Sequence, residues 1–146
     1  MPTVRRAVTT DLDAVLTLVS AFCVADRHEF DEARVRRALV PLLHDDEHGQ
    51  VWVLDTGHAL TGYAVVTWGW SLESGGRESL LDEIFVSDQG SGLGALLMNA
   101  VLAGAREAGA QTMFLETEAH NERVRRFYDR HGFTADDSVW MSTLLD

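Results

Sequence analysis

The sequence predicts a mixed α/β fold, in which one central sheet is flanked by helices on both faces. Strand-like apolar runs are interleaved along the chain with helix-like runs, whose apolar residues recur at helical spacing. A glycine-rich turn at residues 89–94 joins one of these strands to the helix that follows it. The length of 146 residues, with 46% hydrophobic residues, suits a single domain with one core.

We expect the element order β-α-α-β-β-β-α-β-α-β. The expected strands span residues 3–8, 50–54, 59–68, 79–86, 112–116 and 139–144. The expected helices span residues 10–23, 31–44 and 93–108, and a last helix begins at His120 or Asn121 and ends near Arg130. Residues 55–58 have a composition typical of a hairpin turn, and residues 71–77 are predicted to form a loop. Only part of this order alternates strictly between strand and helix, so it does not fit a doubly wound dinucleotide-binding fold.

Local signals mark the ends of the helices. Thr10 and Asp13 resemble a capping box at the start of the first helix. Pro41 predicts a kink or an early end in the second helix. Gly109 and Gly132 are expected to end the helices that precede them.

The chain is strongly acidic. Its 12 Lys and Arg residues against 23 Asp and Glu residues give a net charge of −11, which repels nucleic acid and anionic lipid. This charge favours small cationic partners, although solubility explains it equally well. No apolar run is long enough to span a membrane, and the N-terminus lacks the apolar core of a signal sequence, so we expect a cytoplasmic protein.

Metal and thiol chemistry are not indicated. The single cysteine, Cys23, cannot form an intrachain disulfide or a cysteine metal cluster, and its apolar neighbours favour a buried core thiol over a nucleophile. The six histidines show no spacing typical of metal ligands. We therefore expect no metal.

The glycine-rich turn at residues 89–94 reads Gln-Gly-Ser-Gly-Leu-Gly. Backbone N–H groups in such a turn can point at one anion, and the dipole of the following helix adds positive character. The turn therefore predicts a phosphate-binding site. Two alternatives stay open, because glycine is also common in plain turns and because Glu116 and Glu118 could supply the acid that a dinucleotide site needs.

Two motifs agree on a family. The first is the acidic strand segment at residues 82–86, Asp-Glu-Ile-Phe-Val, followed by the glycine-rich turn. The second, at residues 121–133, reads Asn-Glu-Arg-Val-Arg-Arg-Phe-Tyr-Asp-Arg-His-Gly-Phe. In content and spacing they resemble the GNAT superfamily of N-acetyltransferases, and the resemblance extends over nearly the whole chain. Residues 68–83 are more loosely similar to the corresponding part of acetyltransferases of polyamines and other small amines.

The resemblance implies a single acetyltransferase domain over residues 1–146. It implies acetyl-coenzyme A as cosubstrate and direct attack of an amine on the thioester while both substrates are bound. Dimers are frequent in this family, and residues 139–141 are candidates to extend a sheet edge or to pack between subunits. The chain departs from the family pattern in having only Ser87 and Asp88 between the strand and Gln89, so we expect a shifted register or weaker binding of the pyrophosphate. Val124 also replaces the usual alanine, a modest packing change.

The resemblance also assigns the catalytic roles. An alkyl ammonium has a pKa of about 10.4, so the site must remove a proton before the amine attacks. Glu83 and Asp82 are adjacent on a strand and are expected to point to opposite faces. We favour Glu83 as the water-linked base and leave Asp82 as the alternative. Tyr128 is the expected general acid for the departing thiolate. A solvated or ion-paired role for Glu83 and a core role for Tyr128 are the structural alternatives.

The expected coenzyme-binding residues lie in three places. Backbone N–H groups near Phe85 and Val86 are implied to polarise the thioester carbonyl. The pyrophosphate is assigned mainly to the backbone of Gln89, Gly90, Ser91, Gly92, Leu93, Gly94 and Ala95. Asn121 is expected to bind the pantetheine arm, to cap its helix, or both. Arg126 is a candidate for a nucleotide phosphate, although pairing with acids along the helix explains it equally well.

The acceptor site is predicted from carboxylates and indole rings, which suit an ammonium group. Asp26 and Glu29 lie in a polar break after the first helix, and Trp68, Trp70 and Glu73 precede the acidic strand. A solvated acidic surface with tryptophans in the core is the alternative. The favoured acceptor is a small cationic amine, such as a polyamine, an amino sugar or an amino-acid derivative. A protein or peptide acetyltransferase and a coenzyme-binding regulatory module without turnover stay open as other functions.

Overall fold

The computed structural model describes residues 2–117 and 121–145, so Glu118 and His120 lie outside the described residues. The chain divides into two compact units, Met1–Glu116 and Thr117–Asp146. The expectation of a single domain over the whole chain stays a prediction.

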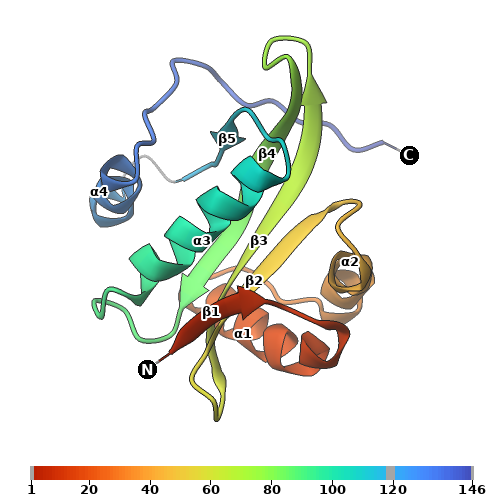
Figure 1. The fold of residues 1–146 in the computed structure, drawn as a ribbon, viewed down its shortest axis with the longest axis vertical. Helices are drawn as coiled ribbons and strands as arrows, with labels where there is room; N and C mark the ends of the chain where they lie inside the picture. Colours follow the sequence, from red (N-terminus) through yellow and green to blue (C-terminus); the bar gives the residue numbers. More distant parts are fainter. Residues whose placement is uncertain (1, 118–120, 146) are drawn as a thin grey trace. The chain divides into compact units, whose positions relative to one another are not determined.

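One mixed sheet forms the centre of the first unit (Figure 1). Its strands lie side by side in chain order: β1 (Thr3–Arg6), β2 (Gly49–Asp55), β3 (Leu60–Ser71), β4 (Gly76–Val86) and β5 (Met113–Phe114). The first four strands are antiparallel to their neighbours, whereas β5 runs parallel to β4. The mixed sheet predicted from the sequence is confirmed.

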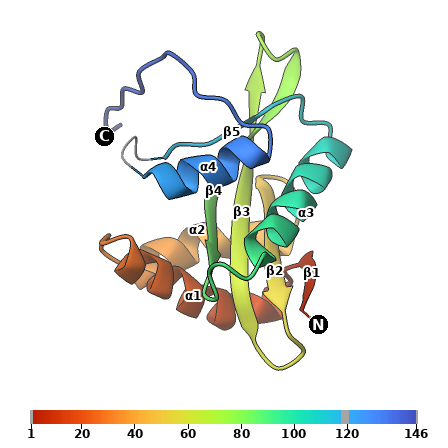
Figure 2. The ribbon, with the colours of Figure 1, turned by 90° about the vertical axis from the view of Figure 1, so that its left-hand side faces the viewer.

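Helices cover both faces of this sheet. They are α1 (Leu12–Ala25), which follows a 3-10 turn (Thr9–Asp11), α2 (Glu32–His44) and α3 (Leu93–Glu107). Figures 1 and 2 show α1 and α2 on one face and α3 on the other. α2 continues past Pro41 to His44, so the early end allowed for there is not observed.

Side-chain alternation along the strands builds a core on each face. On the α1–α2 face, the buried strand residues are Val51, Val53, Tyr63 and Val65, and they pack with Val15, Leu16, Val19, Leu39 and Leu43 of the two helices. On the α3 face, Gln50 and Trp52 lie against Gly104, and Leu97, Met98, Val101 and Ala105 of the helix are buried. β3 and β4 are thereby held between two layers of helices.

The start of α1 is fixed by Asp11 and not by the predicted pair of Thr10 and Asp13. Asp11 Oδ2 accepts hydrogen bonds from Val8 N at 2.7 Å and from Arg5 Nη1 at 2.8 Å, and Oδ1 accepts one from Arg5 Nη2 at 3.0 Å. The hydrogen bonds from Arg5 and then from Val8 lower the pKa of Asp11. The capping-box prediction was wrong because the chain turns earlier, where Arg5 is within reach of a carboxylate.

β3 and β4 form a longer hairpin than predicted. β3 extends to Ser71 and β4 begins at Gly76, so the loop prediction over 71–77 is wrong at both ends. Gly75 and Gly76 adopt positive φ values of 83° and 143°, which permit the tight reversal between the strands. β5 is shorter than the predicted strand at residues 112–116.

The second unit contains α4 (Glu122–Arg130). Asn121 caps this helix, as predicted, because its Oδ1 accepts a hydrogen bond from Val124 N at 3.3 Å. Gly109 after α3 and Gly132 after α4 both adopt φ of 90°, which confirms them as helix-ending glycines.

The strand predicted at residues 139–144 is not present. These residues form neither helix nor strand, and the side chains of Val139, Trp140 and Met141 are exposed. An apolar run becomes a strand only when a neighbouring strand satisfies its backbone, and the described residues of the second unit contain no such neighbour. The prediction was wrong because it rested only on the hydrophobicity of the side chains in this segment.

Candidate active site

A β-bulge in β4 determines where the two adjacent acids point. Glu83 lies opposite Val65 of β3, whereas Leu81 lies opposite Val66, so Asp82 is the extra residue of the bulge. The bulge turns Glu83 towards the α1–α2 face, which Val65 also occupies, while Leu81 faces α3. The regular alternation assumed from the sequence is therefore interrupted at Asp82.

Glu83 is half-buried and is held by one fully buried side chain. The Tyr63 hydroxyl donates a hydrogen bond of 2.6 Å to Glu83 Oε1. The Tyr63 ring packs against Phe85, with ring centroids 6.3 Å apart, and Phe85 in turn packs against Phe22 of α1 at 5.8 Å. The carboxylate thus lies at the edge of an aromatic cluster formed by β3, β4 and α1.

The surroundings of Glu83 make it a better base than an ordinary carboxylate. Burial raises its pKa, and the negative charges of Asp82 and Asp26 raise it further. The hydrogen bond from Tyr63 and the proximity of His28 act in the opposite direction, and the net effect is a raised pKa. A carboxylate with a raised pKa takes up a proton more readily near neutral pH. Desolvation also raises the pKa of Asp82, although that residue is exposed.

The segment after α1 brings acidic and histidine side chains towards Glu83. Asp26 Oδ2 and His28 Nε2 are 2.7 Å apart, and Arg27 between them adopts a positive φ of 57°. Cys23, on the last turns of α1, has a raised pKa because of burial and of the nearby charges on Glu83 and Asp26. A raised pKa keeps the thiol protonated, which agrees with the prediction of a thiol that is not a nucleophile.

The edge of β4 beside Glu83 pairs with no strand among the described residues. Pairing with β5 is confined to Ser79 and Leu80, and no described residue pairs with β4 on that side between Leu81 and Val86. A strand edge of this kind presents backbone N–H and C=O groups to a ligand. The end of the strand is fixed because Ser87 donates from both its N and its Oγ to Thr61 O, each at 2.9 Å.

The glycine-rich turn continues directly from this edge into α3. Gly90 and Gly92 adopt φ of 82° and 83°, and Ser91 Oγ donates to Asp88 O at 2.7 Å within the turn. Gly92 is the N-cap of α3, no side chain caps the helix, and its first turn contains no acidic residue. No side-chain hydrogen bond therefore caps the N–H groups at the start of α3, which suits an anion, and the phosphate-binding site stays a prediction.

Tyr128 and Arg126 lie on α4 in the second unit. The Tyr128 ring contacts Phe127 and Phe133, with centroid distances of 5.5 and 5.9 Å. Arg126 is exposed. The general-acid role of Tyr128 and the coenzyme contacts assigned to Arg126 and Asn121 stay predictions.

The residues predicted for the acceptor site are only partly brought together. Asp26 acts electrostatically on Glu83, and Glu29 is exposed in the same segment. Trp68 lies opposite Ser79 and Trp70 opposite Arg77, so strand alternation places both on the α3 face, away from Glu83. Glu73 lies in the turn of the hairpin that these strands form.

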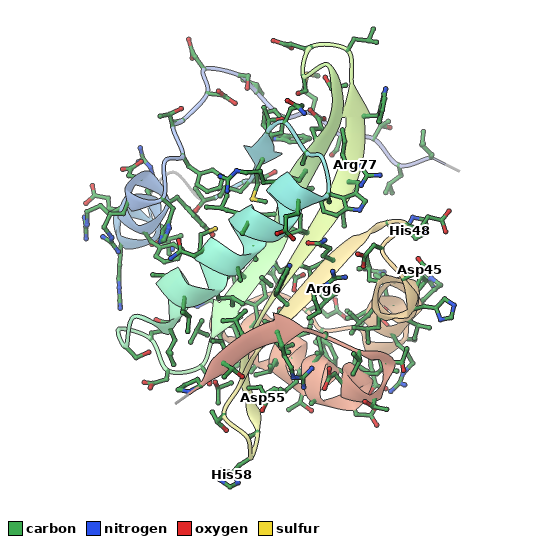
Figure 3. All side chains as sticks on the ribbon, in the orientation of Figure 1. Arg6, Asp45, His48, Asp55, His58 and Arg77 are labelled. Atoms are coloured by element: carbon green, nitrogen blue, oxygen red, sulfur yellow. The ribbon has the colours of Figure 1, made fainter. Side chains whose placement is uncertain are left out.

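Trp68 has structural partners of its own on that face. Its Nε1 donates to Asp46 O at 2.9 Å, and the guanidinium of Arg77, labelled in Figure 3, lies 5.2 Å from the ring centroid. Trp70 is 77% exposed. The structure therefore separates the two tryptophans from Glu83.

Sequence reasoning missed Tyr63. Its hydroxyl donates the hydrogen bond to Glu83, yet the residue lies inside an apolar strand and belongs to no motif. A regular hairpin register, continued from the pairs Trp70–Arg77 and Trp68–Ser79, would have placed Tyr63 opposite Ile84; the bulge shifts it to lie opposite Phe85. The contact with Glu83 itself depends on the bulge, which leaves no signal in the sequence.

No group of three or more His, Cys, Asp and Glu side chains within residues 2–117 and 121–145 is arranged to hold a metal ion. Over the same residues, no helix is long and apolar enough to cross a membrane. The cytoplasmic location and the dimer stay predictions.

Comparison with known proteins identifies the family and agrees with this fold. The sequence pattern of the acetyltransferase (GNAT) family matches residues 13–133. The chain is 25% identical over 135 residues to the uncharacterized N-acetyltransferase YhfO of Bacillus subtilis strain 168, a match that covers 91% of this chain and 90% of YhfO.

Solved structures share the fold. An integron cassette protein, HFX_CASS3, from the mobile metagenome of Cole Harbour Salt Marsh superposes with a TM-score of 0.87 and 28% identity, over 99% of this chain and 91% of that one. A putative acetyltransferase from Arthrobacter sp. FB24 has a TM-score of 0.83 and 23% identity, over 99% and 96% of the two chains.

The fold and the family match thus support an N-acetyltransferase. The chain belongs to the acetyltransferase (GNAT) family.

Proposed function

We propose that this protein transfers the acetyl group of acetyl-coenzyme A to a primary amine of a small cationic acceptor. The observation that carries the proposal is the position of Glu83. This half-buried carboxylate with a raised pKa lies at a bulge of β4, beside a strand edge that leads into the glycine-rich turn.

The residues present fit acetyl-coenzyme A. The uncapped N-terminus of α3, preceded by Gly90 and Gly92 in positive φ, suits the pyrophosphate. The unpaired edge of β4 from Leu81 to Val86 suits an extended arm that contains amide groups. When bound, the coenzyme would supply an activated thioester. Asn121 and Arg126 of the second unit are further candidates for coenzyme contacts.

In the proposed mechanism, the side chains of this chain handle two protons. Glu83 receives the proton of the acceptor ammonium through water, which leaves a neutral amine to attack. Backbone N–H groups near Phe85 and Val86 stabilise the negative charge that develops on the carbonyl oxygen. Tyr128 donates its phenolic proton to the sulfur as the C–S bond breaks, so the thiol leaves in its neutral form. The phenolate then recovers a proton, through water, from the newly acylated nitrogen, which gives the neutral amide. Asp82 stays the alternative base.

The choice of a small cationic acceptor rests on charge. Asp26 and Asp82 both act on Glu83, so the base lies in a locally negative environment. The net charge of −11 adds attraction over longer distances. Glu29 lies in the same segment as Asp26 and is proposed as a second acceptor contact. The position of Trp68, Trp70 and Glu73 on the β3–β4 hairpin makes their direct contact with the same acceptor less favourable, and we do not place them in the mechanism.

The test is release of free thiol from acetyl-coenzyme A with a panel of acceptors. The panel contains polyamines, aminoglycosides, amino acids and short peptides, and acetyl-coenzyme A binding is measured separately by calorimetry. We expect turnover with polycations and a loss of about 10²- to 10⁴-fold in kcat for Glu83→Gln and for Tyr128→Phe, with coenzyme binding retained.

Other outcomes would change the proposal. Turnover with peptides and none with small amines would replace the acceptor class. Tight coenzyme binding without transfer to any amine would favour the regulatory module. Full activity of Glu83→Gln would move the base to Asp82 or elsewhere.

A further inference from the structure

Tyr63 is a buried polar group that the proposed mechanism does not use. Its side chain is fully buried in the α1–α2 face of the sheet, and its hydroxyl donates to Glu83 Oε1 at 2.6 Å. A buried hydroxyl needs a partner, and a hydrogen bond to a carboxylate is stronger than one to a neutral group. This contact therefore binds Tyr63 and Glu83 into one unit.

The ring of Tyr63 has little freedom to move. β3 places it directly opposite Phe85, the two rings pack at 6.3 Å, and Phe85 is held in turn by Phe22. A fixed ring fixes the direction of its hydroxyl, and the hydroxyl fixes one oxygen of the carboxylate. Among the described residues, no donor is found for Glu83 Oε2.

We propose that Tyr63 is the positioning residue for the base: it holds Glu83 Oε1 and leaves Oε2 as the atom that receives the proton of the acceptor. This inference rests on the proposed function, because it assumes that Glu83 is the base. Tyr63 itself keeps its proton throughout. Burial and the charge of Glu83 raise the pKa of Tyr63 well above its ordinary value, so it donates a hydrogen bond but does not transfer the proton.

The hydrogen bond also sets the pH range in which Glu83 is ionised. It favours the charged carboxylate, so its loss should raise the pKa of Glu83. The other groups that act on Glu83 are Asp82 on β4 and Asp26 and His28 after α1, and all of them remain in a variant that lacks only the hydroxyl. Cys23 on α1 acts on the Tyr63 side of the pair and remains as well.

The test is a direct titration of Glu83 in Tyr63→Phe. Protein labelled with ¹³C at the glutamate side-chain carboxyl is titrated by NMR, and Glu83→Gln assigns the resonance. We expect the midpoint for Glu83 to move to higher pH by about one pH unit in Tyr63→Phe, the size expected for one hydrogen bond to a charged group. With any acceptor that turns over, the acidic limb of kcat/KM should move in the same direction.

Ser79→Ala is the matched control. Ser79 also carries a buried hydroxyl, which donates to Thr112 O at 2.8 Å, but it lies opposite Trp68 on the α3 face. Its loss should lower thermal stability without moving the titration of Glu83. A merely structural role of Tyr63 would give Tyr63→Phe the same behaviour.

A second measurement covers the case in which Tyr63→Phe does not fold. The chain has two tyrosines, so 3-fluorotyrosine in the otherwise unchanged protein gives two ¹⁹F resonances, which Tyr128→Phe assigns. The Tyr63 resonance should shift with pH at the midpoint measured for Glu83.

The outcomes separate the two ideas. An unchanged Glu83 midpoint in folded Tyr63→Phe, or a Tyr63 fluorine resonance that ignores the Glu83 titration, overturns the positioning role whatever the acceptor is. Full turnover by Glu83→Gln overturns the base of the proposed function, and that readout is independent of the titration.

Discussion

Gly92 offers the sharpest test of the coenzyme site. It is the N-cap of α3 and adopts φ of 83°, in the left-handed region, and a Cβ added there would meet no atom within 4 Å. Gly92→Ala therefore introduces backbone strain without a steric clash. The strain acts at the one residue that directs the turn into the helix.

The size of the effect follows from the conformation. An alanine in the left-handed region costs about 1–2 kcal/mol relative to glycine. If the turn relaxes into another conformation to relieve this strain, coenzyme binding must restore it. Because about 1.4 kcal/mol corresponds to a tenfold change in affinity, we expect the Kd of acetyl-coenzyme A to rise by about 5- to 30-fold.

Gly75→Ala provides a control with the same strain. Gly75 lies in the β3–β4 turn, also adopts φ of 83°, and would also place a Cβ in open space. Calorimetric titration with acetyl-coenzyme A and urea unfolding should be run on both variants. Gly75→Ala should lose free energy of unfolding and bind the coenzyme as tightly as the unchanged protein. Gly92→Ala should bind the coenzyme more weakly and lose less free energy of unfolding, because its turn relaxes when the coenzyme is absent.

Equal coenzyme affinity of Gly92→Ala and the unchanged protein would refute the reasoning. It would show that the backbone at the start of α3 does not contribute to binding. Equal weakening in both variants would refute it as well, because the effect would then come from general destabilisation.

Two further predictions concern stability. Asp11→Asn should lower the free energy of unfolding at pH 7 by about 1–2 kcal/mol, because it weakens the hydrogen bonds from Arg5 and Val8 to a charged group. Folding lowers the pKa of Asp11 from 3.8, so its contribution to stability is complete above pH 3.8 and is lost as the pH falls through the folded pKa. Urea unfolding from pH 7 to pH 2 should therefore show a shrinking difference in stability between Asp11→Asn and the unchanged protein. A constant difference would contradict the role of the carboxylate. Gly49→Ala should cost about 3 kcal/mol, because the added Cβ would lie 1.9 Å from the carbonyl oxygen of Val66 and the strands would have to move apart. Gly57→Ala is the control, because its methyl group meets open space at φ of 92°, and it should lose less free energy of unfolding in the same thermal and urea measurements. If Gly49→Ala lost no more free energy of unfolding than Gly57→Ala, the prediction would be wrong.

The parts of the site that are local in sequence could be predicted. The glycine-rich turn carries its own conformational signal, since Gly90 and Gly92 adopt the positive φ that their lack of a Cβ permits. Asn121 caps α4 through a hydrogen bond three residues along the chain, which sequence spacing alone indicates. The motif singled out Asp82 and Glu83, but their expected directions assumed a regular strand, which the bulge at Asp82 interrupts.

The parts that depend on neighbouring strands could not be predicted. The register between β3 and β4 places Trp68 and Trp70 on the face away from Glu83. The sequence does not specify this register, so it suggested a single acceptor site that contained the tryptophans and the acids together. The predicted strand at residues 139–144 failed for a related reason, because strand formation needs a partner that a single segment does not specify.

The sequence by itself determined the order of elements up to α4, the glycine-rich turn before α3 and the presence of two adjacent acids on β4. Each of these depends on residues close together in the chain, where local backbone preferences act. Only the tertiary structure decided that Asp82 forms a bulge, that Glu83 faces α1 and that Tyr63 holds its carboxylate. These are long-range outcomes, because the register of two strands and the burial of a hydroxyl are fixed by packing across the sheet.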